Sequence, residues 1–143
     1  MNTKFSVAVH SLILISEAED PMTSEQIAAS VGSNPSYIRK VLTLLRNAGM
    51  IEAHRGIRGF RMNIPASDLS LYQIYQAISN GDELQLFDIH QNPNDQCIVG
   101  RHIKNILEDT YSDLQIQLLN TMKAKRLKDC IDEIRNLEEV KVK

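Results

Sequence analysis

Cysteine is scarce in this sequence, and no long uninterrupted apolar run is present. The 143 residues include two cysteines, Cys97 and Cys130, which are too few for a disulfide scaffold and typical of a reducing compartment. The longest apolar stretch near the start, residues 7–15, is interrupted by His10 and Ser11. It lacks the basic region and cleavage site of a signal peptide, and it is not a membrane span. We therefore expect a cytoplasmic protein without a membrane partner.

Sequence motifs of enzymes are also missing. The chain has no phosphate-binding loop, no convincing pair of nucleophile and base, and no paired carboxylates in a plausible cleft. The acidic pairs Asp82-Glu83 and Glu138-Glu139 are more simply solvated surfaces. We expect a protein without catalytic residues, without enzymatic activity and without a cofactor.

The charge of the chain is small but unevenly distributed. The formal net charge is −2, and residues 65–143 carry more acidic than basic groups. Residues 33–63, in contrast, contain one acid, Glu52, among several basic side chains. A basic block inside an acidic chain indicates a localised anion-binding surface. The basic residues of this block are Arg39, Lys40, Arg46, Arg55, Arg58 and Arg61.

Residues 23–51 have the pattern of two helices joined by a tight turn. Thr23 and Gln26 form a capping-box pattern at the start of the first helix, and Gly32 suits its end. Asn34 followed by Pro35 is a favourable start for the second helix. The apolar residues of this second helix recur at steps of three and four, and they are Ile38, Val41, Leu42, Leu45 and Ala48.

This arrangement is typical of a helix-turn-helix motif, because the second helix also has a polar and basic surface. The polar residues are Ser36, Arg39, Lys40, Thr43 and Arg46. An ordinary helical hairpin with a solvated basic surface would have the same pattern, and the pattern alone does not decide between the two.

A β-hairpin is predicted directly after the second helix. Residues 50–53 and 60–63 are two short extended runs, and the loop between them contains two glycines. In this position a hairpin is the wing of a winged helix, and Arg55, Arg58 and Arg61 lie at or near its tip. A solvated surface hairpin is the less favoured alternative, because three arginines fall within seven residues beside a basic helix.

The rest of the chain is predicted to consist of helices, with one linker between them. Residues 4–18 form a first helix with a broad apolar surface, and Leu71, Ile74 and Ile78 mark a helix after the wing. We predict a mainly α fold in three parts. They are a winged helix-turn-helix domain over residues 1–81, a linker over 82–96, and a long dimerisation helix with a C-terminal helix over 97–143.

The long helix is the clearest indication of a partner. About 26 residues from Cys97 onward would span roughly 39 Å, more than a small domain needs for its own core. The apolar surface of this helix is wide, and the simplest partner that would bury it is a second copy of the chain in a two-fold dimer. The final amphipathic segment, containing Leu127, Ile131, Ile134 and Leu137, could fold back on this helix.

Six segments of the chain together carry a family resemblance, and they are residues 3–5, 24–28, 36–42, 45–51, 55–59 and 69–74. Their order and spacing are similar to those of the Rrf-type family of bacterial winged helix-turn-helix transcriptional regulators. The segment Asn92-Pro93-Asn94 followed by residues 97–100 most resembles the YwnA-like members, which lack an iron–sulfur cluster. The resemblance implies a homodimer in which the long helix crosses its mate and the recognition helices enter successive major grooves.

The sequence departs from the family in two places. The family wing commonly has Arg-Gly, two residues and then Gly-Gly-Tyr, whereas the tip here is HRGIRGF. The iron–sulfur members place three cysteines where this chain has Cys97 alone, and one thiolate does not hold a [2Fe–2S] cluster. The spacing of His90, Cys97 and His102 matches no established ligand pattern, so no metal site is expected.

Sequence and resemblance together predict a sequence-specific DNA-binding regulator, acting as a homodimeric repressor on a palindromic operator in double-stranded DNA. Ser36, Tyr37, Arg39 and Lys40 would approach base edges and phosphates, and Thr43 and Arg46 would anchor the backbone. The alternative function, of a different class, is a winged helix that serves as a protein–protein interaction module and does not bind DNA.

The signal that such a regulator would sense is less defined. Cys97 precedes the long helix, where the helix dipole lowers a thiol pKa, so a redox-sensor role is one interpretation. A half-buried structural cysteine is the favoured interpretation, because most cysteines are inert. A small-molecule effector bound between the winged helix and the long helix is a further alternative.

Overall fold

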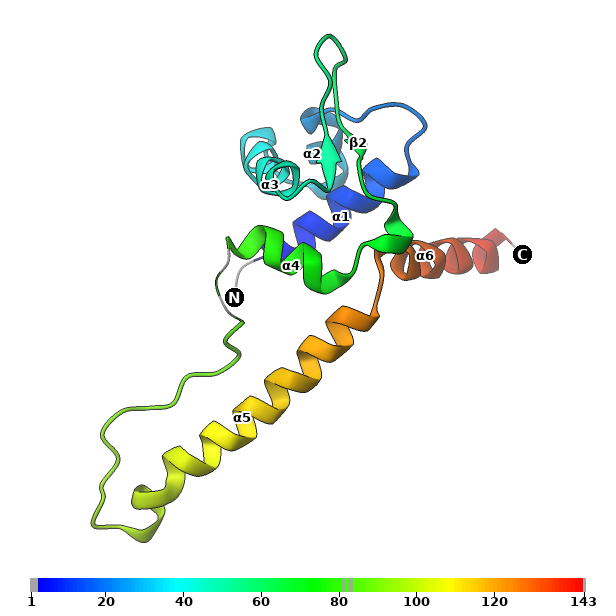
Figure 1. Ribbon diagram of the computed structural model, residues 1–143. Helices are drawn as coiled ribbons and strands as arrows, with labels where there is room; N and C mark the ends of the chain where they lie inside the picture. Colours follow the sequence, from blue (N-terminus) through cyan, green and yellow to red (C-terminus); the bar gives the residue numbers. More distant parts are fainter. Residues whose placement is uncertain (1–2, 81, 83, 143) are drawn as a thin grey trace.

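A computed structural model of the chain describes residues 3–80, 82 and 84–142. Helices α1 to α4 and a two-stranded sheet form one unit, α5 extends away from it, and α6 lies against it again (Figure 1). The elements are α1 (Lys4–Glu17), α2 (Ser24–Val31), α3 (Pro35–Asn47), β1 (Ile51–Glu52), β2 (Arg61–Met62), the 3-10 turn η1 (Ala66–Asp68), α4 (Leu71–Ser79), α5 (Ile98–Ala124) and α6 (Leu127–Val142). The mainly helical winged fold predicted from the sequence is confirmed.

Local hydrogen bonds fix where α2 and α3 begin. Thr23 accepts a hydrogen bond from the Gln26 backbone at 3.2 Å, and the Gln26 side chain accepts one from the Thr23 N–H at 3.0 Å. The Asn34 side chain accepts from the Tyr37 N–H at 2.8 Å. Gly32, with φ of 79°, ends α2 in the left-handed region. The predicted capping residues are thus confirmed at both helices.

The core lies between α1, α3 and α4. The predicted apolar face of α3 is confirmed at Ile38, Val41, Leu42 and Leu45, each of which is 0% exposed. Ala48 was expected on the same face, but α3 ends at Asn47 and Ala48 is an exposed capping residue. Burial of these four side chains orients α3, because the opposite side of the helix must then face solvent.

The hairpin is shorter than its apolar pattern suggests. Strands β1 and β2 are antiparallel, with Ile51 opposite Met62 and Glu52 opposite Arg61. Beyond this ladder, Phe60 pairs with Met22, which precedes α2. The Met22 N–H donates to the Phe60 carbonyl at 3.1 Å and the Phe60 N–H donates to the Met22 carbonyl at 2.8 Å. The second arm of the wing is therefore attached to the loop between α1 and α2.

Gly59 permits this close approach of two backbone segments. Its φ is +112°, and a Cβ atom at this position would lie 2.9 Å from the Met22 carbonyl carbon. A side chain would clash with main-chain atoms, which have no rotamer through which to move away. The second glycine of the unusual HRGIRGF tip, Gly59, therefore has a structural role in holding the wing.

Helix α6 packs differently from the expectation that it folds back on the long helix. Leu127 is 0% exposed and Ile131 is 4% exposed, and both belong to the core of the winged-helix unit. The Leu127 N–H donates to the Leu69 carbonyl at 2.8 Å, which fixes the start of α6 beside η1. Arg135 also forms an ion pair with Glu17 of α1 at 2.7 Å. The division of the chain into three domains stays a prediction.

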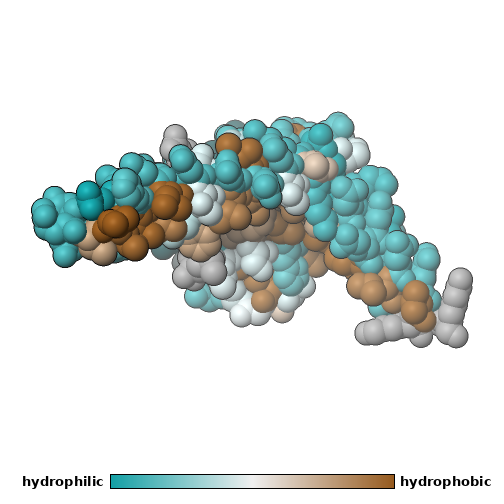
Figure 2. Space-filling view, turned by 90° about the horizontal axis from the view of Figure 1, so that it is seen from below, coloured by the Kyte–Doolittle hydropathy of each residue, from teal (hydrophilic) through white to brown (hydrophobic). Residues whose placement is uncertain are grey.

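Helix α5 forms an arm with an apolar surface. Figure 2 shows hydrophobic residues gathered along this arm, which projects to one side of the unit. Part of the linker lies against α5, because the rings of Phe87 and Tyr111 are 5.2 Å apart between centroids. None of the helices in the described part of the chain has the length and hydropathy needed to cross a membrane. Apolar residues of α5 that remain largely exposed are Ile98, Val99, Ile106, Leu114 and Ile116.

Candidate nucleic-acid interface

The solvent side of α3 is polar and positively charged. The side chains of Ser36, Arg39, Lys40, Thr43 and Arg46 are exposed, as the sequence pattern predicted. This follows from burial of the apolar side of α3, because residues three and four positions apart share one face of a helix. The helix thus presents hydroxyl, ammonium and guanidinium groups in one strip, which matches the chemistry needed for phosphates and base edges.

Thr43 and Tyr37 of α3 both make side-chain contacts within the protein. The Thr43 hydroxyl donates to the Arg39 carbonyl at 2.8 Å, so its proton is used inside the helix although the residue is exposed. Tyr37 is half-buried and its side chain packs against the core. Ser36 and Lys40 are consequently freer than these two residues to approach a ligand, whereas Arg39 is paired with Glu25 of α2.

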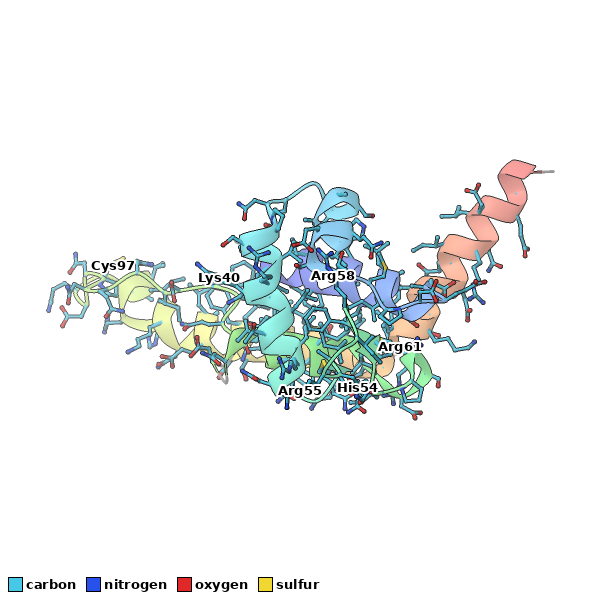
Figure 3. All side chains as sticks on the ribbon, turned by 90° about the horizontal axis from the view of Figure 1, so that it is seen from above. Lys40, His54, Arg55, Arg58, Arg61 and Cys97 are labelled. Carbon is cyan, nitrogen blue, oxygen red and sulfur yellow. The ribbon has the colours of Figure 1, made fainter. Side chains whose placement is uncertain are left out.

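The wing adds three further cations to this surface. Arg55, Arg58 and Arg61 are exposed, as the sequence predicted. Figure 3 looks down on the tip of the hairpin and shows these arginines with Lys40 of α3 to one side of them. His54, which the sequence reasoning did not select, is also in the wing and pairs with Glu52, with Nε2 and Oε1 2.9 Å apart. The structure therefore brings the two halves of the basic block onto neighbouring elements.

Glu25 is a second residue of this surface that the sequence reasoning missed. Its Oε1 lies 3.6 Å from Nη1 of Arg39, and its Oε2 lies 3.9 Å from Nη2 of Arg58. The hydrogen bond from its own backbone N–H lowers the pKa of Glu25, and the Ser24 hydroxyl, Arg58 and Arg39 act in the same direction. No sequence signal joins these residues, because they come from α2, α3 and the wing.

A shallow hollow lies between the start of α2 and the start of α3. It combines one acidic residue with two cations and an aromatic ring, and of these the two cations are the groups suited to phosphates. The residues that line it are Glu25, Asn34, Pro35, Ser36, Tyr37, Arg39 and Lys40.

Cys97 is remote from this surface, at the far end of α5 (Figure 3). The favoured interpretation of Cys97 as half-buried is wrong, since the residue is exposed. The backbone N–H groups of Gly100 and Val99 lower the pKa of the Cys97 thiol, because they stabilise the thiolate. Cys130 is half-buried, and burial raises the pKa of its thiol. The two cysteines thus have opposite environments.

Two hollows are candidates for a small ligand. One lies between α4 and α5, with a volume of about 330 Å³, and Tyr72, Tyr75 and Leu119 are among its lining residues. This is the region in which the sequence placed an effector. The other is a larger apolar groove between α1 and α6, lined in part by Phe5 and Ile134. Effector binding stays a prediction at either place.

Several solved structures have the same fold as this chain. The crystal structure of a protein with a proposed DNA-binding role is 33% identical, with a TM-score of 0.70, and the match covers 90% of this chain and 98% of that one. The structure of T. potens IscR has the same TM-score at 17% identity and covers 94% of this chain and 87% of that one. The second likeness, at so low an identity, concerns the fold alone.

The sequence profile of the Rrf2 family, described as an iron-dependent transcriptional regulator, matches residues 1–133. The donor groups in the described part of the chain do not fit an iron site. Cys97 and Cys130 are its two cysteines, and they lie on either side of α5 along the chain. Within the described residues, no group of three His, Cys, Asp or Glu side chains is placed to hold a metal ion.

A curated relative extends the similarity over nearly the whole chain. YwnA of Bacillus subtilis (strain 168), named as a candidate HTH-type transcriptional regulator, is 35% identical over 134 residues, which is 94% of this chain and 98% of YwnA. The profile match, this relative and the shared fold agree with one another. The chain therefore belongs to the Rrf2 family of transcriptional regulators.

Proposed function

We propose that this regulator binds specific sequences in double-stranded DNA and represses transcription as a homodimer on a palindromic operator. The observation that carries the proposal is the arrangement of the basic block. Arg39 and Lys40 are exposed on α3, and Arg55 and Arg58 are exposed on the adjoining wing. A helix for the major groove and a cationic hairpin beside it would together contact bases and backbone.

The residues of α3 and the wing would divide the work of recognition. Ser36, Arg39 and Lys40 would approach base edges, because they are exposed along the first turns of α3. The half-buried Tyr37 would contribute an edge of its ring. Residues that would hold the DNA backbone are Thr43, Arg46, Arg55, Arg58 and Arg61.

The apolar surface of α5 supports the homodimer. Ile98, Val99 and Ile106 are 70%, 66% and 59% exposed. A large exposed apolar patch usually marks an interaction surface, and a two-fold dimer would bury the same patch on both copies. Such a dimer would present two recognition helices to half-sites about one helical turn apart, roughly 34 Å.

The proposal is tested by selecting bound genomic fragments with the purified protein and measuring affinity for the selected sequence by gel retardation. If about three cations per protomer meet phosphates, a dimer neutralises about six, and affinity falls with a log–log salt slope near −5. Arg39→Ala and Lys40→Ala should weaken binding, whereas Lys104→Ala on α5 is a matched control that should not. Binding without salt dependence would contradict the proposal.

The alternative is a winged helix that binds another protein instead of DNA. Under this alternative, Arg39→Ala and Lys40→Ala would bind the selected DNA with the same affinity as wild type in gel retardation, or the purified protein would select no genomic fragment at all. Repression, as opposed to activation, is tested by placing the selected operator between a promoter and a reporter gene. Expression of the regulator should then lower the reporter signal, and a rise would refute the repressor assignment.

A signal transmitted through Cys97 would be a property of the same regulator. The exposed position and the lowered pKa of the Cys97 thiol support this role. The test compares DNA release by wild type and Cys97→Ser after treatment with a thiol oxidant. Equal release by the two proteins would exclude Cys97 as the sensor.

A further inference from the structure

We propose that Glu25 is a specificity-determining residue of the DNA interface, whose carboxylate holds Arg39 and Arg58 together and limits their attraction to the phosphates of non-operator DNA. This inference rests on the proposed function, because it concerns the discrimination between operator and other sequences. Glu25 belongs to α2, which precedes the basic block in the sequence.

The geometry places one carboxylate between two cationic elements. The Glu25 Oε1 atom is 3.6 Å from Nη1 of Arg39 on α3, and the Oε2 atom is 3.9 Å from Nη2 of Arg58 in the wing. The Ser24 hydroxyl donates to Oε2 at 3.3 Å, which further orients the carboxylate. One acid therefore connects the recognition helix to the wing across the surface that would face DNA.

Fold stability does not explain this arrangement. The Glu25 side chain is 53% exposed, and those of Arg39 and Arg58 are 55% and 81% exposed. Ion pairs so open to solvent contribute little to the free energy of unfolding. Their effect on a polyanion is larger, because the carboxylate lies well within one Debye length of both guanidinium groups. Glu25 thus acts on the charge that the interface presents.

The interactions that this surface makes differ between operator DNA and random DNA. On random DNA the protein gains affinity almost entirely from phosphate neutralisation, which a carboxylate in the cationic surface opposes. On an operator, Arg39 would contact a base edge with fixed geometry, and a partner that restrains the guanidinium lowers the entropy lost on binding. Glu25 therefore weakens binding to random DNA more than binding to the operator, and so it raises the ratio of the two affinities.

The test compares Glu25→Gln with Glu108→Gln in the full-length protein. Glu108 is a matched control, because it is 52% exposed and lies 3.9 Å from Lys104 on α5. Each substitution removes one negative charge, so a general effect of net charge would appear in both variants. The duplexes are one fragment selected from genomic DNA by the wild-type protein and one random-sequence duplex of equal length.

For Glu25→Gln we expect tighter binding to random DNA and a steeper salt dependence. One additional effective cation per protomer makes the log–log slope of the dimer steeper by about 1.8. The affinity ratio of Glu25→Gln to wild type on random DNA then changes by about twelvefold between 200 mM and 50 mM salt. Affinity for the selected fragment should change less than about threefold, and Glu108→Gln should match wild type on both duplexes.

Two further variants show whether the carboxylate acts through the arginines. Glu25→Asp keeps the charge and an acid in the first turn of α2, so it should retain the wild-type slope. In a protein that also carries Arg39→Ala and Arg58→Ala, Glu25→Gln should no longer raise affinity for random DNA. Circular dichroism and sedimentation confirm that each variant is folded and has the assembly state of wild type.

Several results would overturn the inference. The first is that Glu25→Gln and Glu108→Gln change the affinity for random DNA equally. The second is that Glu25→Asp and Glu25→Gln have the same log–log salt slope. The third is that Glu25→Gln loses affinity for both duplexes. In each of these cases wild type still binds its selected fragment, so the proposed function stands. If wild type binds neither duplex in a salt-dependent manner, the proposed function and this inference both fail.

Discussion

Truncation of Leu127 should destabilise the winged-helix unit, although the residue is remote from it in sequence. Leu127 is 0% exposed at the start of α6 and belongs to the same core as the apolar residues of α1, α3 and α4. Leu127→Ala removes buried methyl groups and leaves a cavity that the surrounding helices fill only in part. Substitutions of this kind destabilise proteins by about 2–5 kcal/mol, and we expect about 3 kcal/mol here.

The corresponding change in melting temperature follows from the size of the chain. At about 2.1 cal/mol/K per residue, unfolding of a chain of this length has an entropy of about 0.3 kcal/mol/K. A loss of about 3 kcal/mol then lowers the melting temperature by about 10 °C. The assay is thermal and urea unfolding followed by circular dichroism. All proteins are compared at one concentration, because the stability of an assembly depends on protomer concentration.

Leu137 supplies a control on the same helix. Its side chain is 68% exposed, so Leu137→Ala should change the free energy of unfolding by no more than about 0.5 kcal/mol. If Leu127→Ala and Leu137→Ala destabilised the protein equally, α6 would not be part of the core, and the packing described above would be refuted. A large loss for Leu127→Ala alone would show that the last helix completes the first unit.

Three further predictions concern the backbone, a helix cap and the thiols. Gly59→Ala should destabilise the protein by about 1–3 kcal/mol, because the residue has positive φ and contacts main-chain atoms, and urea unfolding measures the loss. Thr23→Ala should cost about 1 kcal/mol in the same assay, whereas Thr3→Ala, which removes no side-chain cap, should be nearly neutral. Iodoacetamide should alkylate Cys97 at lower pH than Cys130, because the thiol pKa is lowered at Cys97 and raised at Cys130. Mass spectrometry of the labelled peptides measures both reactions, and alkylation of Cys130 at the lower pH would contradict the prediction.

Local sequence signals predicted the helices well. The capping residues Thr23 and Asn34 and the glycine at position 32 act within one turn of the chain, so they are visible in a short window of sequence. The apolar spacing of α3 likewise predicted which of its sides is buried. Exposure of Arg39 and Lys40 followed from that burial, and the structure agrees. These features require no knowledge of distant residues.

Pairing between distant segments was not predictable in this way. The Phe60 backbone pairs with Met22, and no periodicity in either segment indicates it. The final amphipathic segment was expected to cover α5, because its apolar spacing fits any apolar surface. Only the placement of η1 and α1 decides that Leu127 enters the core of the first unit.

The sequence by itself determined that this protein has a helix-turn-helix with a basic second helix, a hairpin wing and a long amphipathic helix. These properties depend on capping, on residue spacing and on charge within short stretches of chain. The tertiary structure alone decided that α6 packs on α1, that the wing attaches to the loop before α2, and that Glu25 lies between Arg39 and Arg58. Each of these contacts joins residues far apart in sequence, and their proximity depends on how the helices pack and not on any local preference.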